Sequence, residues 1–375
     1  MKYLFVALSL FIIMGCNRKS NTADNSQLSH QVKIMLDSIQ LDHVNSSYVG
    51  NVILFNDTLY FIDYSFGWVY MFNSDGTFLS RTLGQGNGPH EIPIKGISSC
   101  CFLPNGDKIF IGSTLDGYLF NQDWNLEKSF FIDRSENGHF TQDHLTPENP
   151  FSYTLDYEHL TMRSDPSSKY LFVPVYAEQK NFNPYTRQYY KESRLLEQID
   201  LEDGRIIDLL GRRSPEYLKY HYIGQYAFFS FDITRRGTFY ITHEIDSLIY
   251  VYNNKFQLLS TFGRSGTMMN TDYIEADHFD LMTFRKLYFI EKPKHGYYSY
   301  LEYIDGTGLL FRSYKKSEAS KSDGLQIYRN KILIADISVP KDFKVIGYKK
   351  PYYYSGPYID EEQETIKLFR FIIKD

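Results

Sequence analysis

Eight polar residues of this chain have side chains suited to ligand binding or acid–base chemistry, and they recur where apolar segments end. They are two aspartates, a tyrosine, two histidines, two glutamates and an arginine: Asp63, Tyr64, His90, Glu91, His243, Glu244, Arg264 and Asp336. Carboxylates, imidazoles and a guanidinium that meet at one mouth could hold a small ligand. The same groups could support metal-assisted hydrolysis or elimination. Each residue alone is also explained as a solvated loop end, because loops are generally polar.

Signatures of known catalytic and metal sites are absent from the sequence. The chain has no Cys-x-x-Cys or His-Glu-x-x-His spacing for zinc, and no Gly-x-Ser-x-Gly nucleophile elbow. The acidic run Asp272–Asp280 lacks the glycine and ligand spacing of a calcium loop. We therefore predict no metal and no cofactor, and we favour a binding module over an enzyme.

Short apolar and aromatic segments, broken by Gly, Asn and Asp, continue through most of the chain and must position these residues. The first clear unit has four such segments, 51–55, 58–63, 67–72 and 77–83, joined by tight turns. The chain contains 33 Tyr and 29 Phe, which favour pleated strands. The pattern predicts an all-β fold of four-stranded antiparallel units.

The unit repeats along the chain. Tyr70–Asn73 is matched by Tyr118–Asn121 and again by Tyr250–Asn253. Four strands in every 40–50 residues or so predict a single β-propeller, with six blades or alternatively seven. The expected blades span 46–83, 94–132, 151–211, 225–263, 278–315 and 323–350, and a last strand covers 364–373. That strand, or the run Gln31–Leu36, should close the ring by pairing with the opposite terminus.

Small residues give two local predictions. Gly76, Gly106, Gly204 and Gly237 each precede the second or last strand of a blade, so we expect them in equivalent turns. The neighbouring residues Cys100 and Cys101 should point to opposite faces of a strand as free, buried thiols.

The N-terminal segment predicts where the protein is located. Lys2, an apolar run and Gly15 precede Cys16, and this pattern resembles a bacterial lipobox. The resemblance implies cleavage before Cys16 and lipidation of its thiol. The apolar run is about a dozen residues long, short of the roughly 20 needed to span a bilayer. We therefore predict a signal peptide at 1–15, a flexible tether at 16–30 and the propeller domain at 31–375.

A glycine-rich loop carries a family resemblance. The segment Leu83–Glu91, with the sequence LGQGNGPHE, is similar to the G-x-G-x-G-P-x-E signature of six-bladed propeller lipoproteins from Bacteroidetes. The lipobox and the four-strand repeats also resemble a lipoprotein family of unknown function in that phylum. The resemblance implies a TolB-like or NHL-like propeller in the cell envelope, without established chemistry. His90 stands where such loops often have glycine. No helix can begin after this loop, so a structural turn explains the glycines better than a phosphate cradle.

Charge narrows the range of partners. The net charge of −5 and pI near 6.1 give no footprint for nucleic acid, so membrane contact would depend on the lipid. No acidic cluster follows Cys16, which favours an outer-membrane position facing the periplasm. We expect a membrane-tethered envelope module that binds a small molecule, glycan, peptide or envelope protein. The alternatives are a metal-assisted hydrolase or lyase with its site at the channel mouth, and an architectural part of an envelope assembly.

Overall fold

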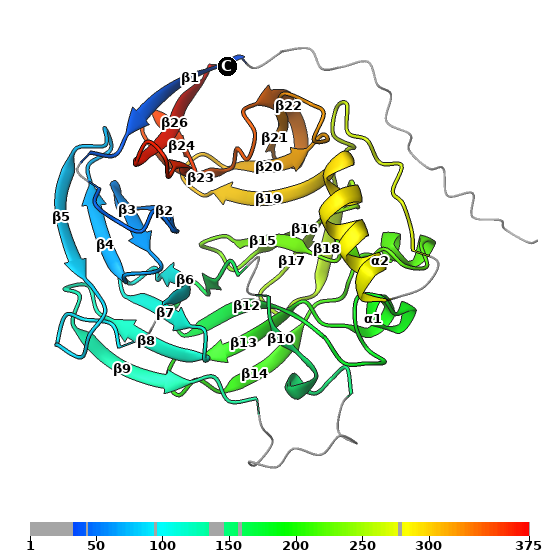
Figure 1. Cartoon of the computed structure of the whole chain (residues 1–375), viewed down its shortest axis with the longest axis horizontal. Coiled ribbons are helices and arrows are strands. Elements are labelled where there is room, and N and C mark those ends of the chain that lie inside the picture. The colour runs from blue at the N-terminus through cyan, green and yellow to red at the C-terminus, as the bar shows by residue number, and fades with distance from the viewer. Residues whose placement is uncertain are drawn as a thin grey trace, which may run out of the picture.

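The computed structural model is a ring of β-sheets around a central axis (Figure 1). It describes residues 33–42, 44–93, 96–134, 146–156, 160–276 and 280–374. Within these ranges the strands form six sheets, four with four strands and two with five. The predicted six-bladed β-propeller of four-stranded antiparallel blades is therefore confirmed, and the seven-bladed alternative is wrong.

The blades follow one another along the chain, and each starts with the strand nearest the axis. Blades 1 and 2 consist of β2 (Gly50–Phe55), β3 (Thr58–Asp63), β4 (Trp68–Phe72) and β5 (Phe78–Leu83), then β6 (Ile97–Phe102), β7 (Lys108–Gly112), β8 (Asp116–Phe120) and β9 (Leu126–Phe131). Blade 3 consists of β10 (Thr154–Leu155), β11 (Arg163–Ser164), β12 (Tyr170–Tyr176), β13 (Leu196–Asp200) and β14 (Ile206–Leu210). Blade 4 consists of β15 (Phe229–Ile233), β16 (Phe239–His243), β17 (Ile249–Tyr252) and β18 (Leu258–Phe262).

The last two blades complete the ring. Blade 5 consists of β19 (Tyr297–Ile304), β20 (Leu309–Lys315), β21 (Asp323–Arg329) and β22 (Ile332–Val339). Blade 6 consists of β23 (Val345–Lys349), β24 (Tyr352–Ser355), β25 (Tyr358–Asp360), β26 (Thr365–Lys374) and β1 (Lys33–Gln40). The helical segments are η2 (Pro150–Ser152), α1 (Arg187–Glu192), η3 (Pro215–Lys219), η4 (Gly224–Tyr226), α2 (Leu281–Arg285), η5 (Lys286–Glu291) and η6 (Lys292–Lys294).

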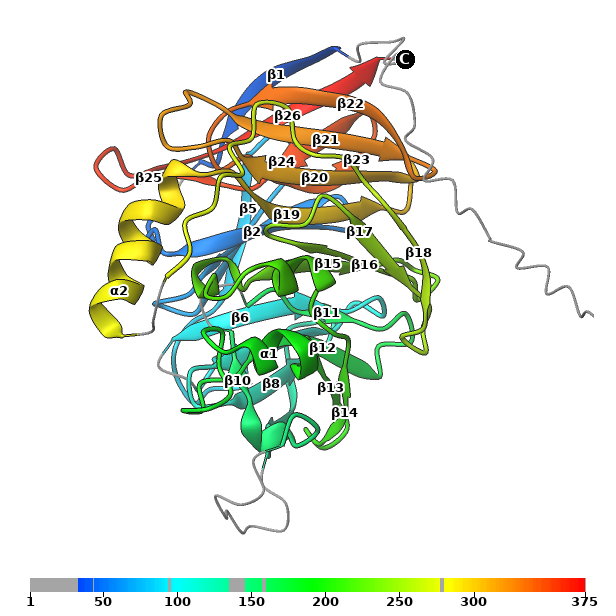
Figure 2. The ribbon, with the colours of Figure 1, turned by 90° about the vertical axis from the view of Figure 1, so that its right-hand side faces the viewer.

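The two faces of the propeller differ. The connections between blades and the turns between the second and third strands of a blade lie on one face, which we call the loop face, and the other turns lie on the opposite face. Helix α2 and strand β25 both project from the loop face (Figure 2). Helix α1 lies in the connection between β12 and β13. Asp63 and His243, the last residues of β3 and β16, also lie at this face.

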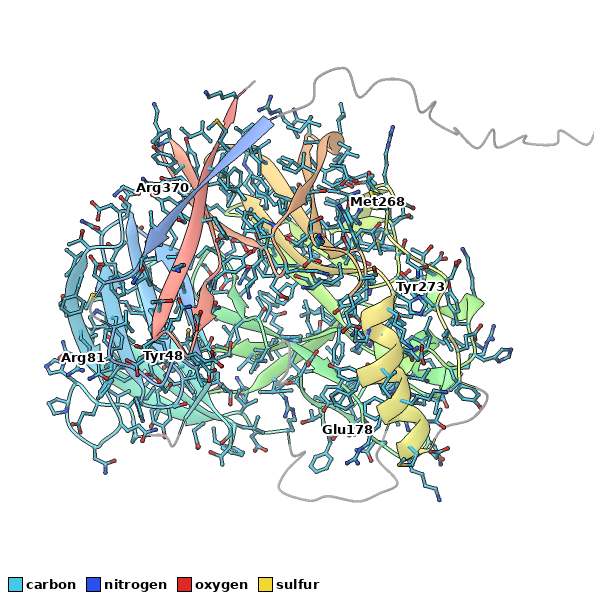
Figure 3. The ribbon with its side chains drawn as sticks, turned by 45° about the horizontal axis from the view of Figure 1, so that its top comes forward. Tyr48, Arg81, Glu178, Met268, Tyr273 and Arg370 are labelled. Carbon is cyan, nitrogen blue, oxygen red and sulfur yellow. The ribbon has the colours of Figure 1, made fainter. Side chains whose placement is uncertain are left out.

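The two ends of the described chain close the ring together. Strand β1 pairs antiparallel with β26 along its whole length, from Lys33 opposite Lys374 to Gln40 opposite Lys367. An ion pair of 2.7 Å joins Asp37 to Arg370, which is labelled in Figure 3. The predicted closure by pairing of the termini is confirmed: β1 covers the edge of β26 and becomes the outermost strand of blade 6.

The sequence repeat corresponds to one turn, built in the same way in three blades. The side-chain oxygen of Asn73 accepts hydrogen bonds from the backbone N–H groups of residues 75 and 77. Asn121 and Asn253 make the same two bonds to the residues two and four positions on. Asparagine is favoured here because its side chain can replace a backbone acceptor in a turn.

The four glycines also lie in turns as predicted. Gly76 and Gly204 precede the last strands of their blades, and Gly106 and Gly237 precede second strands. All four have positive φ, between 74° and 94°. Glycine adopts this conformation without the steric cost that a Cβ would impose.

The expected spans of the last two blades are wrong. Residues 278–315 were expected to form one blade, but 281–294 are helical and blade 5 begins only at Tyr297. Strands β21 and β22, expected in the next blade, complete blade 5. Asp280 caps the helix by accepting hydrogen bonds from the N–H groups of Met282 and Thr283. The acidic run was interpreted as a loop, and its last residue was a helix start signal.

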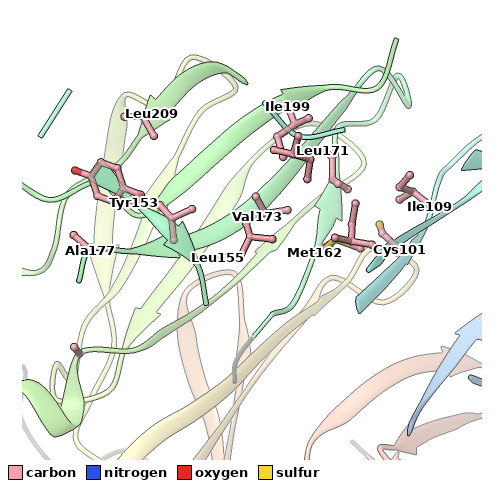
Figure 4. Close-up of a cluster of buried hydrophobic side chains, with 14 of the residues drawn as sticks. Cys101, Ile109, Tyr153, Leu155, Met162, Leu171, Val173, Ala177, Ile199 and Leu209 are labelled. Carbon is pink, nitrogen blue, oxygen red and sulfur yellow. The ribbon is translucent and has the colours of Figure 1, made fainter. Parts of the chain in front are cut away.

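Hydrophobic clusters fill the spaces between neighbouring sheets. Cys101 packs with Ile109 and Leu171 between blades 2 and 3 (Figure 4), whereas Cys100 packs with Ile62 between blades 1 and 2. Both thiols are free and buried, as predicted. In the part of the chain that the structure describes, no helix has the length and apolar character of a membrane span. The predicted signal peptide, the tether and Cys16 lie outside the described residues.

Candidate functional site

Asp63 and Tyr64 have different roles at the end of β3. Asp63 is fully buried and accepts hydrogen bonds from the Ser47 hydroxyl at 2.6 Å and from the N–H groups of Ser65 and Phe66, both at 2.9 Å. Its carboxylate therefore holds two loops together. Tyr64 lines the central channel.

His90 and Glu91 lie in the connection between blades 1 and 2, outside the channel lining. Glu91 Oε2 accepts a hydrogen bond of 2.7 Å from the Gly88 N–H. A Cβ on Gly86 would lie 2.0 Å from the same oxygen, so the loop needs glycine there. His90 is exposed, and its Nδ1 is 3.2 Å from the Trp124 carbonyl oxygen. The glycine-rich loop is a turn folded around a carboxylate.

His243 and Glu244 are enclosed at the end of β16. His243 is 1% exposed and contacts the rings of Tyr217, Phe229 and Tyr250. Burial, with the charge of Arg213 adding to it, lowers the pKa of His243 to about 3. The imidazole is consequently neutral at physiological pH.

Glu244 fastens the helical insertion to blade 4. Its Oε1 is 2.7 Å from Lys292 Nζ, and both side chains are buried. The ammonium also lies 4.8–5.6 Å from the centroids of four rings, those of Tyr226, Phe228, Tyr288 and Tyr297. Among the described residues, no group of three or more His, Cys, Asp or Glu is arranged to hold a metal ion. The convergence of ligands on His243 and Glu244 that would favour the enzyme alternative is not seen there.

Arg264 and Asp336 hold the connection between blades 4 and 5. The Arg264 side chain is exposed, and its carbonyl oxygen accepts a hydrogen bond of 2.7 Å from Arg312. Asp336 lies on the outermost strand β22 and accepts hydrogen bonds from the Thr267 N–H at 3.1 Å and the Tyr314 hydroxyl at 2.6 Å. Neither residue lines the channel cavities.

These polar residues were expected to gather at one channel mouth, and their role as a binding site stays a prediction. Of the eight, only Tyr64 lines the two cavities described next. The physical reason is that each blade must fix its turns and its connection to the next blade with hydrogen bonds. A fold that repeats its blades also repeats its structural polar groups.

Two cavities of about 290 and 520 Å³ lie along the propeller axis and share part of their walls. The smaller one extends toward the ends of the inner strands, where Phe55 and Phe102 line it. The larger one is bordered by Asp342 and Pro357 of the loop face. We call the shared wall the waist, and it consists of Asn51, Tyr64, Leu160, Thr161, Tyr300 and Lys344.

A charged network forms one side of the smaller cavity. Arg163 Nε is 2.7 Å from Asp232 Oδ1, and its Nη2 is 2.7 Å from Glu302 Oε2. The Tyr300 hydroxyl donates a 2.8 Å hydrogen bond to the same glutamate oxygen. The Tyr303 N–H donates one of 2.7 Å to Asp232 Oδ2. Blades 3, 4 and 5 each supply a charged residue from their inner strands.

The network changes the proton affinity of its members. Burial raises the pKa of Glu302 to about 8; the charge of Asp232 adds to this shift, while Arg163 opposes it. Burial also lowers the pKa of Lys344, which lies at the waist. Perturbed ionisable groups in a cavity are typical of functional sites, although structural networks produce them too.

Sequence reasoning found Tyr64 but missed the charged channel residues Arg163, Asp232, Glu302 and Lys344. A usable signal was present, because Asp232 and Glu302 are the only charged residues in their first strands, which are otherwise mainly aromatic and aliphatic. Aligning the first strands, rather than the ends of the second strands, would have placed both carboxylates next to the axis. Lys344 gave no such signal, because it lies in a short connection between blades.

Comparisons with known proteins agree with the architecture. No family model matches the chain, and no curated protein matches its sequence. A solved structure of a DUF4221 family member from Bacteroides vulgatus superposes with a TM-score of 0.68 at 12% identity, covering 92% of this chain and 99% of that one. A "putative exported protein" from Bacteroides fragilis gives 0.55 at 14% identity, covering 91% and 96%. These likenesses establish the fold. They agree with the predicted resemblance to Bacteroidetes propellers and do not test its TolB-like or NHL-like character.

Proposed function

We propose that this protein is a cell-envelope binding module, attached to a membrane through lipidated Cys16, whose central channel captures a small polar molecule. The observation that carries the proposal is the pair of axial cavities, which meet at a waist with polar side chains. Their volumes, about 290 and 520 Å³, are close to the range of small-molecule sites. Concave sites with a few fixed polar groups are the usual form of ligand pockets.

The direction of the first strand supports access from the side away from the membrane. Strand β1 runs toward the loop face, so Lys33 lies on the opposite face, away from α2 and β25 (Figure 2). A tether that precedes Lys33 would therefore leave from the face opposite the larger cavity. The fold neighbour described as exported supports an envelope location, and the lipobox supports attachment through a lipid. The absence of an acidic cluster after Cys16 favours an outer-membrane position facing the periplasm.

A channel-filling variant tests the binding role. Ser299 lines the larger cavity and is exposed to it, so Ser299→Trp should fill the channel without disturbing a packed core. A thermal-shift screen of sugars, amino acids and organic acids should find compounds that stabilise the wild type but not Ser299→Trp. Ser80→Trp, on the exposed outer strand β5, is the matched control and should keep the response. Compounds that stabilise all three proteins equally would contradict binding in the channel.

A second experiment tests the membrane attachment separately. Cys16→Ala should move the protein from the detergent phase to the aqueous phase, because the predicted lipid carries the attachment. Detection of the processed variant in the detergent phase would show that the anchor is elsewhere.

A further inference from the structure

We propose that the waist contains a carboxylate-binding site centred on Lys344, and that the ligand is a monoanionic, hydroxyl-bearing small molecule such as a sugar acid. This inference rests on the proposed channel-binding function and names the ligand class for it.

Lys344 is held in place by the neighbouring loop. Its carbonyl oxygen accepts a 2.8 Å hydrogen bond from the Gly356 N–H. A Cβ at position 356 would lie only 2.8 Å from Lys344 Cε, so Gly356 leaves room for the lysine side chain. The ammonium is 5.5 Å from the centroid of the Tyr300 ring, at the wall common to both cavities. The charge is thus directed to the waist by its surroundings.

The Lys344 ammonium has no carboxylate at ion-pair distance among the described residues, although the charges of Asp342 and Glu302 act on it. In the described part of the chain, no carboxylate forms an ion pair with it and no acceptor forms a hydrogen bond with it. The neighbouring cations are already paired: Arg163 with Asp232 and Glu302, and Lys315 with Asp323 at 2.8 Å. A charge removed from water is costly unless it is paired, so an anion from outside would be stabilised here.

The charge balance favours a single negative charge. Arg163 and Lys344 stand beside Asp232 and Glu302, and burial raises the pKa of Glu302, which favours its neutral form. Asp342, whose charge also acts on Lys344, is already paired with Lys315. The network then carries one excess positive charge. A carboxylate neutralises it, whereas a phosphate dianion would bring a second charge without a second free cation. The guanidinium fork that suits phosphate is already occupied.

The rest of the waist suits hydroxyl groups. Asn51 provides an amide, Thr161 a hydroxyl, and Tyr64 and Tyr300 provide aromatic rings with polar ends. Ser299 adds a hydroxyl in the larger cavity. Side chains that combine flat apolar surface with hydrogen-bonding groups match the two surfaces of a sugar ring.

Calorimetry with three named probes tests the ligand class. Glucuronate should bind the wild type at least tenfold more tightly than neutral glucose, and more tightly than inorganic phosphate. Lys344→Met should remove the preference for glucuronate over glucose and still fold, because it removes a half-buried charge that has no ion-pair partner. The exposed Lys367→Met on β26 is the matched control and should retain the preference. Stronger binding of phosphate than of glucuronate would overturn the choice of a carboxylate.

The outcomes separate the two proposals. If glucuronate and glucose bind equally and Ser299→Trp blocks both, the carboxylate site is wrong and the channel function stands. If neither sugar binds, acetate provides the direct test, with the pKa of Lys344 followed by NMR of its Cε. Acetate at constant ionic strength should raise that pKa, because a bound anion stabilises the ammonium. A pKa that does not change with acetate concentration would overturn the anion site.

Discussion

Arg312 and Arg163 are both enclosed, but they differ in two respects. Arg312 contacts neutral acceptors in a closed interior, whereas Arg163 contacts carboxylates beside a cavity. Arg312 is fully buried and donates to the carbonyl oxygens of Ser247 at 2.9 Å and Arg264 at 2.7 Å, and to Gln326 Oε1 at 2.9 Å. Its guanidinium lies 3.8 Å from the centroid of the Tyr298 ring. Arg163 instead contacts two carboxylates, and a cavity lies beside them.

The comparison distinguishes polar groups that only hold the fold together from polar groups that a bound ligand could affect. Arg312 satisfies neutral acceptors in a closed interior, so its bonds fix the connection between blades 4 and 5 in one arrangement. Arg213 resembles it, since it donates to the Val175 carbonyl at 3.3 Å and lies 5.0 Å from the centroid of the Tyr189 ring. The Arg163 network contains groups that can gain or lose a proton next to an open volume. Only the Arg163 network can change its protonation or its ion pairs when a molecule enters the cavity.

The largest expected effect tests the structural role of Arg312. Arg312→Met should lower the free energy of unfolding by about 3 kcal/mol, because it leaves several buried acceptors without donors. Arg264→Ala is the control, because its side chain is exposed and only its backbone carbonyl is used; it should change stability by less than about 0.5 kcal/mol. Urea denaturation measures both. Equal losses in the two variants would contradict the comparison.

The next effect concerns His243, which is buried beside Arg213. Its folded pKa of about 3 lies below its ordinary value of 6.5, so the unfolded chain binds more protons between these two pH values. Stability should therefore fall as the pH falls, by about 2 kcal/mol between about pH 7.5 and pH 5. His243→Phe should flatten this part of the profile. The exposed His221→Gln should leave the slope unchanged, and a flat wild-type profile would refute the assignment.

Glu302 should give the opposite slope. Its folded pKa of about 8 lies above its ordinary value of 4.5, so the folded protein binds more protons between these values. Its contribution to stability is present at low pH and is lost as the pH rises through 8. Glu302→Gln should remove this loss and improve stability near pH 8 by about 1 kcal/mol relative to wild type. If Glu302→Gln and His243→Phe change the slope of unfolding free energy against pH in the same direction, the raised pKa assigned to Glu302 is wrong.

The smallest expected effect tests whether the glycine-rich loop stabilises the fold or binds a ligand. Glu91→Ala should lower stability by about 1 kcal/mol, because the Gly88 N–H loses its acceptor. His90→Ala should change stability by less than about 0.5 kcal/mol, because that side chain is exposed. Neither variant should affect ligand capture in the channel. Loss of binding in Glu91→Ala with unchanged stability would restore this loop as a site.

Local interactions made much of the fold predictable. The turn at Asn73 depends on bonds to residues only two and four positions away, so it repeats as a readable pattern at Asn121 and Asn253. The alternation of a strand likewise placed Cys100 and Cys101 in two different clusters. The helix 281–294 was missed because one capping residue was interpreted as part of an acidic loop.

The candidate site was not predictable by the same means. His243 and Glu244 follow an apolar strand, as a ligand-binding pair would, but rings enclose one and Lys292 neutralises the other. Sequence position says which face of the propeller a residue approaches, and it does not say whether neighbouring blades cover it. Burial depends on contacts between residues distant in the chain.

The sequence by itself determined the repeating four-stranded unit, because the unit follows from turn chemistry and strand periodicity over short distances, and it favoured six blades over seven. Only the tertiary structure decided which polar groups face an open volume. Arg163, Asp232, Glu302 and Lys344 come from different blades or connections, and they meet only because the ring closes. The charges of such a site are set by their mutual distances and by their removal from water, and both quantities exist only in the folded chain.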